Sequence, residues 1–340
     1  MQQKIFVTGG TGFLGSYLLR YLVHQGYKNI YALKRPSSKL DLVTEVAHQI
    51  NWLEGDILDF SFLEEAMQGM DQVYHCAAMI SFLPKEADKM MQINETGTAN
   101  IVNLALHHQV KKLVYISSIA AIGKETGDDI ISEKTKWKND KTNSNYAKSK
   151  YAAEMQVWRG IAEGLNAAIL NPSIILGSGF WNGGSTKIFE LYGKGFPFYV
   201  EGSNGYVDVR DVAKMAILLM ESDISGERFL VNAENLSYKK VFTEISNCAK
   251  VKPPYLKITP LLGAIGWRVQ WIVSKLTCIN PTITKETLNS ALGKSSYNNQ
   301  KSLAAFNFKY TPISETITET TSQFVAAKKE GMKPMSLPLN

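Results

Sequence analysis

The sequence predicts an α/β fold in which helices cover both faces of a doubly wound parallel sheet. Two observations carry this prediction. Short apolar runs alternate with helix-period segments through residues 1–172, and a glycine-rich turn separates the first run from the first helix. Repeated strand–helix–strand units need right-handed crossovers and give a parallel sheet that is buried on both sides. After Pro172 the alternation gives way to clustered glycines, prolines and aromatic residues, which predicts a smaller second domain.

A length of 340 residues allows two domains. We assign residues 1–172 to the sheet domain and expect residues 206–232 to return to it. Residues 173–205 and 233–330 form the second region. Residues 331–340, GMKPMSLPLN, are expected to fray as a tail.

The individual elements follow from apolar spacing, with a period of two for strands and about 3.6 for helices. The expected strands are 4–8, 29–33, 51–55, 72–77, 112–117, 166–170 and 228–231. The expected helices are 13–24, 40–48, 61–67, 85–106, 145–163, 211–220 and 313–329, with an amphipathic stretch at 261–276.

Composition and charge limit the class of protein. Hydrophobic residues make up 45% and charged residues 20%, which excludes global disorder, collagen and a disulfide scaffold. The net charge of 37 − 31 = +6 suits an anionic cofactor or a membrane surface and is small for a dedicated nucleic-acid binder. No run resembles a spanning helix, and MQQKIFVTGG has no signal-sequence pattern, so we expect a cytoplasmic protein without a nucleic-acid partner.

The cysteines and histidines are consistent with a cytoplasmic protein that binds no metal. Cys76, Cys248 and Cys278 are far apart and odd in number, which is typical of thiols in a reducing compartment. The five histidines form no zinc-binding spacing, so we expect no metal site.

The glycine-rich turn is typical of a phosphate-binding loop. Thr8–Gly15 follows the first strand and opens the first helix, with glycines at 9, 12 and 15. Glycines let a diphosphate approach backbone N–H groups, and a helix N-terminus favours an anion. The sequence therefore predicts a dinucleotide site, the alternative being a merely flexible turn.

The end of the second strand bears on the choice between NADP and NAD. An NAD site usually has an acidic residue there, whereas this strand ends in Lys34-Arg35-Pro36-Ser37-Ser38. Arginine holds a phosphate with two charge-assisted hydrogen bonds, so Arg35 and Ser38 predict NADP, with NAD still open. Asp56, after the third strand, either accepts from an adenine amino group or caps a helix.

A serine, a tyrosine and a lysine form the candidate catalytic set. Ser117 and Ser118 end the fifth strand, and Tyr146 and Lys150 are four residues apart at the start of a helix. Free tyrosine titrates near pKa ~10, and a nearby ammonium lowers that value. A serine hydroxyl can hold a substrate oxygen while tyrosine exchanges its proton.

With these motifs in order, the chain resembles the extended short-chain dehydrogenases/reductases, the NAD(P)-dependent epimerase/dehydratase family, which have a Rossmann-type domain. The matching segments are 8–15, 73–78, 94–100, 117–123, 146–150, 171–173 and 207–213.

The resemblance implies roles for particular residues. Tyr146 would be the acid/base, Lys150 would lower its pKa and bind the nicotinamide ribose, and Ser118, five residues before Gly123, would polarise the substrate. Asn94 would support the site structurally. The predicted cofactor-binding residues are Gly9, Thr11, Gly12, Phe13, Leu14, Gly15, Arg35, Ser38, Asp56, Ile57, Ala77, Ala78, Tyr146, Lys150, Pro172, Ser173 and Ile174.

Two departures from the family indicate a branch. Ile119 and Ala120 follow Ser118, where sugar-nucleotide dehydratases carry an Asp-Glu pair. Residues 202–207 contain no arginine for a sugar diphosphate. The pattern is similar to the dihydroflavonol-reductase and 3β-hydroxysteroid-dehydrogenase branch.

Substrate-side residues are expected after Ala78 and after Pro172. Ile80, Phe82 and Trp181 predict an apolar, aromatic pocket for a small molecule, the alternative for each aromatic being core packing. The stretch 261–276 has three readings: a domain-packing face, a pocket-covering helix or an interfacial membrane helix.

Three functions are compatible with the sequence. The first is an NADP-preferring oxidoreductase that interconverts a carbonyl and an alcohol. The second is a nucleotide-sugar epimerase with a transiently reduced cofactor, and the third a non-catalytic dinucleotide sensor. The resemblance suggests a monomer or homodimer.

Overall fold

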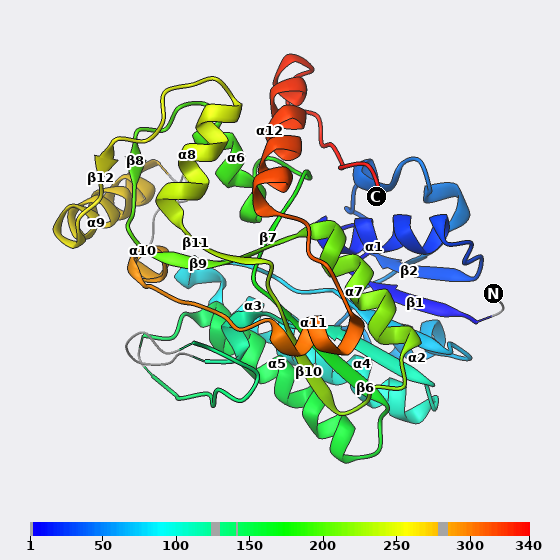
Figure 1. Ribbon diagram of the computed structural model, residues 1–340. Helices are drawn as coiled ribbons and strands as arrows, with labels where there is room; N and C mark the ends of the chain where they lie inside the picture. The colour runs from blue at the N-terminus through cyan, green and yellow to red at the C-terminus, as the bar shows by residue number, and fades with distance from the viewer. Residues whose placement is uncertain (1–2, 124–129, 141, 278–284) are drawn as a thin grey trace.

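The computed structural model describes residues 3–123, 130–140, 142–277 and 285–340. Its larger lobe is built on a seven-stranded parallel sheet in the order β10-β6-β5-β4-β1-β2-β3 (Figure 1). The predicted fold class is confirmed. The strands are β1 (Ile5–Thr8), β2 (Ile30–Lys34), β3 (Asn51–Glu54), β4 (Gln72–His75), β5 (Lys112–Ile116), β6 (Ala167–Pro172) and β10 (Glu227–Val231).

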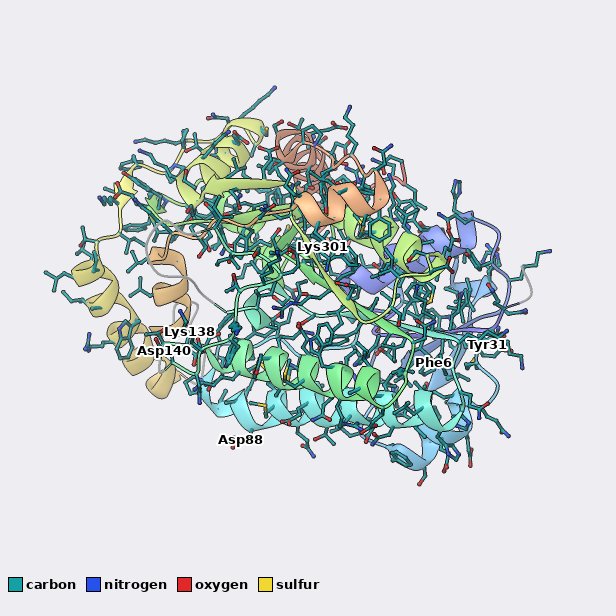
Figure 2. All side chains as sticks on the ribbon, turned by 60° about the horizontal axis from the view of Figure 1, so that its bottom comes forward. Phe6, Tyr31, Asp88, Lys138, Asp140 and Lys301 are labelled. Carbon is teal, nitrogen blue, oxygen red and sulfur yellow. The ribbon has the colours of Figure 1, made fainter. Side chains whose placement is uncertain are left out.

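Helices cover both faces of this sheet. On one face α1 (Phe13–His24) packs with α7 (Val209–Glu221), and on the other lie α2 (Phe60–Met67), α4 (Gly97–His107) and α5 (Asn145–Ala162). Figure 2 shows α4 and α5 running side by side beneath the sheet. Successive strand residues point to opposite faces, so Ile5 and Val7 join one apolar cluster and Phe6 the other. All three side chains are fully buried.

The strand order reverses its direction between β1 and β4. From β1 the chain first builds outward through β2 to β3, then crosses back to β4 on the other side. Ligands of open α/β sheets bind at this reversal, outside the carboxyl ends of the strands. The glycine-rich turn after β1 lies there.

Two predicted helices differ in the structure. Residues 40–48 form two 3₁₀ turns, Asp41–Val43 and Ala47–Gln49, because Thr44 donates its hydroxyl to Leu40 O and β-branched neighbours disfavour a helix. Residues 85–106 form α3 (Ala87–Met91), a π-helical segment Gln92–Thr96 and then α4.

The smaller lobe lies at one end of the sheet (Figure 1). Its core is rich in aromatic residues, among them Phe189, Tyr192 and Phe242. Its strands are β7 (Ile174–Leu176), β9 (Ser203–Asp208), β11 (Glu234–Ser237), and the pair β8 (Phe198–Tyr199) and β12 (Leu256–Lys257). Its helices are α6 (Lys187–Tyr192), α8 (Tyr238–Cys248), α9 (Pro260–Thr277), α10 (Lys285–Leu292) and α12 (Ile313–Lys329).

Later parts of the chain return to the larger lobe. Helix α11 (Gln300–Phe306) packs on β10, where the Phe229 and Phe306 rings lie 5.4 Å apart. Lys301 of this helix binds Glu227 and the Arg228 carbonyl (Figure 2).

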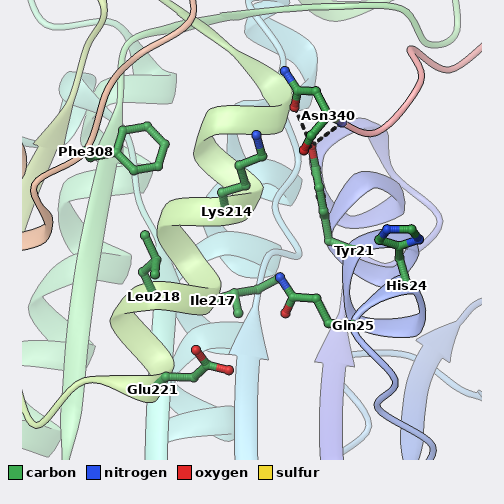
Figure 3. A pocket seen from close by; sticks show the side chains of 9 residues that line it. All are labelled: Tyr21, His24, Gln25, Lys214, Ile217, Leu218, Glu221, Phe308 and Asn340. Carbon is green, nitrogen blue, oxygen red and sulfur yellow. Dashed lines mark hydrogen bonds between the residues drawn. The ribbon is translucent and has the colours of Figure 1, made fainter.

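The prediction of a frayed C-terminal tail is wrong. Leu337 is fully buried, its N–H donates to the Tyr17 hydroxyl, and its carbonyl accepts from Arg20. Tyr21 and Asn340 are also hydrogen-bonded, beside a surface pocket of about 280 Å³ between α1 and α7 (Figure 3). The burial of Leu337 and these hydrogen bonds hold the C-terminal residues in place, although chain ends are usually poorly ordered. Tyr21 and His24 of α1 and the following Gln25 line the pocket, at the end of the helix opposite to the glycine turn.

Candidate active site

The turn between β1 and α1 requires glycine at two positions. Gly9 has φ +73°, and a Cβ there would lie 2.7 Å from the Ala77 nitrogen. A Cβ at Gly15 would lie 2.2 Å from Gly9 O. The turn is thus pressed against the end of β4 and against its own helix, which only residues without a side chain permit.

The N-terminus of α1 is open to an anion. Gly12 is the N-cap residue and supplies no side-chain cap, and its exposed backbone donates to Gly9 O. The first backbone N–H groups of a helix have no partner within it. The site therefore fits the diphosphate of a dinucleotide, whose charge the helix dipole favours.

The two serines after β5 have different partners. The Ser117 hydroxyl donates to the buried Glu154 carboxylate over 2.6 Å. The Ser118 hydroxyl accepts from the Ala120 N–H and lies close enough to the Tyr146 phenol to lower its pKa. Ser118 is thus the serine near the phenol, while Ser117 is held in the lobe's core.

Tyr146 lies in the first turn of α5, which Ser144 caps by accepting from the Ala147 N–H. The residue is partly exposed, its hydroxyl is in buried surroundings, and its ring packs edge-on against Phe82, 5.9 Å between centroids. Burial raises the pKa of Tyr146, while the nearby Ser118 hydroxyl lowers it. The loop after β4 thus places Phe82, a predicted substrate residue, against the predicted acid/base.

Lys150 is buried one turn further along α5. Its ammonium donates to the Tyr115 hydroxyl over 2.8 Å and to Ile116 O over 2.9 Å. Burial lowers the pKa of Lys150 to about 7, and the Glu154 carboxylate opposes that shift. Since both described hydrogen bonds hold the ammonium at β5, the lowering of the Tyr146 pKa by Lys150 stays a prediction.

A buried chain of polar groups runs from this lysine to the glycine turn. The Tyr115 hydroxyl lies close enough to Thr98 for that hydroxyl to lower its pKa, Thr98 is hydrogen-bonded to His75 Nε2, and His75 Nδ1 is hydrogen-bonded to Thr8. Because Thr98 donates to Asn94 O, it accepts from His75, so Nε2 carries the proton. Burial lowers the pKa of His75 to about 3, which keeps the ring neutral.

Asn94 lies in the π-helical segment and is hydrogen-bonded to the loop that follows β4. Its side chain accepts from the Met79 N–H and donates to Met79 O and to the Ser149 hydroxyl. It therefore joins the loop after β4 to the catalytic helix. This agrees with the structural role predicted for it.

At the end of β2 the two cations differ. Lys34 is paired with Glu54, whereas the Arg35 guanidinium is exposed and has no partner within the described residues. A turn brings Ser38 beside Arg35, whose backbone N–H donates to the Ser38 hydroxyl. Arg35 is thus free for an anion.

Asp59, not Asp56, is the helix cap after the third strand, and contact of Asp56 with an adenine stays a prediction. Asp59 caps α2 by accepting from the Phe62 N–H. One carboxylate oxygen of Asp56 accepts from the Leu58 N–H, and the side chain is exposed. Ile57 is buried against Gly97.

Two polar atoms at the end of β6 are buried and have no hydrogen-bond partner among the residues that the structure describes. They are Asn171 Oδ1 and Ser173 Oγ, on either side of Pro172. Orphaned polar atoms of this kind are rare and call for a ligand or water. They provide an acceptor and a donor for an amide group, which fits the nicotinamide end of a dinucleotide.

Trp181 is placed in the smaller lobe's core. It is 2% exposed, packs edge-on against Phe324 and donates its Nε1–H to Lys333 O. These contacts support core packing rather than the substrate contact predicted from sequence. Ile80, in contrast, is exposed on the loop that carries Phe82.

Sequence patterns gave no role to Tyr115, His75 and Glu154. Tyr115 and His75 read as strand residues, and their hydroxyl and ring contacts come from strands β4 and β5 lying side by side. The sequence could have indicated Glu154, because it lies four residues after Lys150 and therefore on the same, buried face of α5. It also binds Arg228 from β10, which only the fold brings near.

Comparison with known proteins identifies the chain. Residues 5–231 match the model of the NAD dependent epimerase/dehydratase family. The chain belongs to this family. The resemblance to extended short-chain dehydrogenases/reductases is therefore confirmed, and members of this family are NAD(P)-dependent.

Reductases are among the similar members of this family. A Synechocystis protein provisionally named a dihydroflavonol 4-reductase is 28% identical and is covered over 95% of each chain. Cinnamoyl-CoA reductase 1 of Petunia hybrida is 26% identical, with 94% of this chain and 91% of that one covered. These relatives support oxidoreduction.

Solved structures agree in fold. The crystal structure of gox2253 has a TM-score of 0.81 and 28% identity, with 97% of this chain and 99% of that one covered. UDP-glucose 4-epimerase of Thermotoga maritima, solved with UDP-glucose, has a TM-score of 0.78 at 19% identity over 96% and 100% of the chains. At 19% identity the latter likeness is one of fold alone.

Proposed function

We propose that this protein is an NADP-preferring reductase or dehydrogenase that interconverts a carbonyl and an alcohol on a small, fairly apolar substrate. The observation that carries the proposal is that Ser118 lies close enough to the Tyr146 phenol to lower its pKa, with buried Lys150 one helical turn away on α5. Phe82 and Ile80 supply apolar surface on the adjoining loop. The reductase relatives are 28% and 26% identical to this chain, compared with 19% for the epimerase structure, which favours a reductase over an epimerase.

In this mechanism the nicotinamide, when bound, exchanges a hydride with the substrate carbon. Ser118 Oγ donates to the substrate oxygen and orients it. Tyr146 Oη gives a proton to that oxygen during reduction and takes it back during oxidation. Lys150 Nζ, held at the end of β5, supplies positive charge that favours the phenolate and a donor for the cofactor ribose.

The cofactor preference is assigned to Arg35 and Ser38. The Arg35 guanidinium and the neighbouring hydroxyl would hold a 2′-phosphate, while Lys34 is already paired with Glu54. A charge-assisted hydrogen bond contributes about 1.5–3 kcal/mol, so Arg35→Ala should weaken NADPH binding about 10- to 100-fold. NADH binding should be unchanged.

The activity is tested with purified protein, NADPH, and a panel of apolar aldehydes and ketones, with UDP-sugars as the competing class. We expect net NADPH consumption with the apolar carbonyls. Turnover of a UDP-sugar without net cofactor change would instead identify an epimerase and overturn the proposal.

The preference is tested by titrating NADPH and NADH into wild type, Arg35→Ala and Lys34→Ala, the last as the matched control. Equal loss of both cofactors in Arg35→Ala, or loss in neither, overturns the NADP assignment. If Lys34→Ala loses as much NADPH affinity as Arg35→Ala does, the 2′-phosphate is not bound specifically by Arg35, and the assignment to Arg35 is wrong.

A further inference from the structure

Exposed apolar side chains gather at one end of the smaller lobe. Ten large apolar side chains are exposed among the described residues, and six of them lie on β8, β12 and the start of α9 or just before these elements. Single exposed apolar residues are ordinary, but a cluster marks an interaction surface. The six residues of this apolar end are Phe198, Tyr255, Leu256, Leu261, Leu262 and Ile265.

The fold holds these side chains in place. Phe198 and Leu256 are paired across the β8–β12 ladder, and the Tyr255 N–H donates to Pro197 O. On α9, Leu261 and Ile265 are one turn apart, so they share a face with Leu262 between them. They are 71%, 53% and 56% exposed, respectively.

The opposite side of α9 is covered. A Cβ at Gly263 would lie 2.6 Å from Leu288 of α10, so this side packs closely on the neighbouring helix. Close packing there leaves the leucine face turned away from the lobe. The remainder of the predicted apolar face, residues 269–276, lies outside the side chains that the structure describes.

The charge of the chain is concentrated in the same segment. Residues 245–285 contain six Lys or Arg and no Asp or Glu, a net charge of +6. The whole chain has 37 − 31 = +6, so the remainder carries 31 of each sign and is neutral. The excess positive charge of the protein therefore belongs to the segment that bears the apolar end.

Several of these cations lie against aromatic rings at the edge of the apolar end. Lys252 Nζ is 4.0 Å from the centre of the Tyr255 ring, and the Arg268 guanidinium is 4.7 Å from the Trp267 ring. Aromatic rings with Lys or Arg beside them are typical of the boundary between lipid chains and headgroups. The segment thus combines an apolar centre with a cationic, aromatic rim.

Charge also distinguishes between two possible partners of the apolar end, a second copy of this chain and a lipid surface. In a twofold dimer the same surface faces itself, so cations such as Lys252 and Arg268 would be brought toward those of the second copy and repel, although Lys257 is already paired with Glu201. An anionic lipid surface complements both the leucines and the cations. No helix in the described part of the chain is long and apolar enough to cross a membrane, so contact at the surface is the relevant mode.

We propose that the apolar end docks on the surface of an anionic lipid bilayer, with Leu261, Leu262 and Ile265 inserted among the lipids. Lys252 and Arg268 then lie at the level of the headgroups. The proposal is independent of the catalytic chemistry, so Tyr146→Phe should bind vesicles as wild type does.

The test is co-sedimentation of the full chain with phosphatidylcholine vesicles, with and without phosphatidylglycerol. We expect binding only to the anionic vesicles, weakening as salt rises. The triple variant Leu261→Ser, Leu262→Ser, Ile265→Ser should bind at least about ten-fold more weakly. The double variant Lys252→Gln, Arg268→Gln should lose about five-fold per cation.

The matched control is the double variant Phe60→Ser, Leu218→Ser, which removes exposed apolar side chains from α2 and α7. It should bind as wild type, and thermal unfolding should show that all variants fold. Equal binding to neutral vesicles, or wild-type binding by the triple variant, overturns the proposal. So does a stable dimer of the wild type in light scattering that the triple variant converts to monomer.

Discussion

The two lobes use their buried polar groups differently. In the larger lobe they form chains that end at the site, from Thr8 through His75 to Thr98 and from Ser117 to Glu154. The core of the smaller lobe is dominated by apolar and aromatic contacts, such as the Tyr192–Phe242 stack with centroids 3.8 Å apart. Directional contacts thus hold the candidate site in the larger lobe, while apolar packing holds the core of the smaller lobe.

The largest expected effect tests the directional contacts. Tyr146→Phe removes the hydroxyl that lies near Ser118 and should lower kcat about 10²- to 10⁴-fold, because proton transfer is lost. The control is Tyr151→Phe on the same helix, whose ring stacks on Trp137. The measurement is steady-state turnover of a carbonyl substrate, and comparable rates in both variants would refute the acid/base assignment.

The glycine turn offers a sharper test with two residues of similar conformation. Gly9 and Gly26 both have positive φ, but a Cβ at Gly9 meets Ala77, whereas one at Gly26 has nothing within 4 Å. Alanine should cost about 1–2 kcal/mol of stability at either site from the left-handed backbone. Only Gly9→Ala should also lose cofactor affinity, by at least about ten-fold, because the turn must shift.

Urea unfolding and cofactor titration of the two variants check this prediction. Unchanged cofactor affinity in Gly9→Ala would show that close approach at β4 does not shape the binding loop.

The junction between the lobes is expected to depend on pH. Asp211 of α7 accepts from the backbone and hydroxyl of Thr311, just before α12. Burial raises the pKa of Asp211 to about 6, and the Asp208 carboxylate adds to the shift. The folded protein thus holds this proton more tightly than the unfolded chain, so stability is present below pH ~4 and falls as the pH rises to about 6.

The loss over this window is about 3 kcal/mol, from roughly two pKa units. Asp211→Asn should flatten that part of the stability curve, measured by urea unfolding at a series of pH values. Parallel curves for wild type and variant would contradict the assignment.

The smallest effect concerns the aromatic core. Trp181→Phe keeps a ring against Phe324 and removes the hydrogen bond to Lys333 O. It should cost about 1 kcal/mol of stability. The KM for substrate should stay at the wild-type value. A changed KM would indicate that Trp181 contacts the substrate after all.

The sequence predicted the parts of the molecule whose reasons are local. The Gly9–Gly15 turn, the strand alternation and the four-residue spacing of Tyr146 and Lys150 each follow from short-range geometry. The role of Ser118 stays a prediction; the structure adds that the Ser117 hydroxyl is already bonded to Glu154.

Contacts between distant segments were not predictable in this way. The burial of Leu337 against α1 depends on residues more than 300 positions earlier, and Trp181 reads equally as core or pocket until Phe324 is placed beside it. The helix predicted at 40–48 fails for a local reason, since Thr44 and its β-branched neighbours favour 3₁₀ turns.

One contact joins the two lobes near the reacting groups. Glu286 of α10 accepts from the side-chain amide of Asn145, over 2.9 Å, and from its backbone N–H. Asn145 immediately precedes Tyr146, and α10 packs on α9. If α9 lies on a bilayer, the enzyme would meet an apolar substrate that is dissolved in the same bilayer. Turnover should then depend on the mole fraction of substrate in the lipid, and it should decline when inert lipid is added.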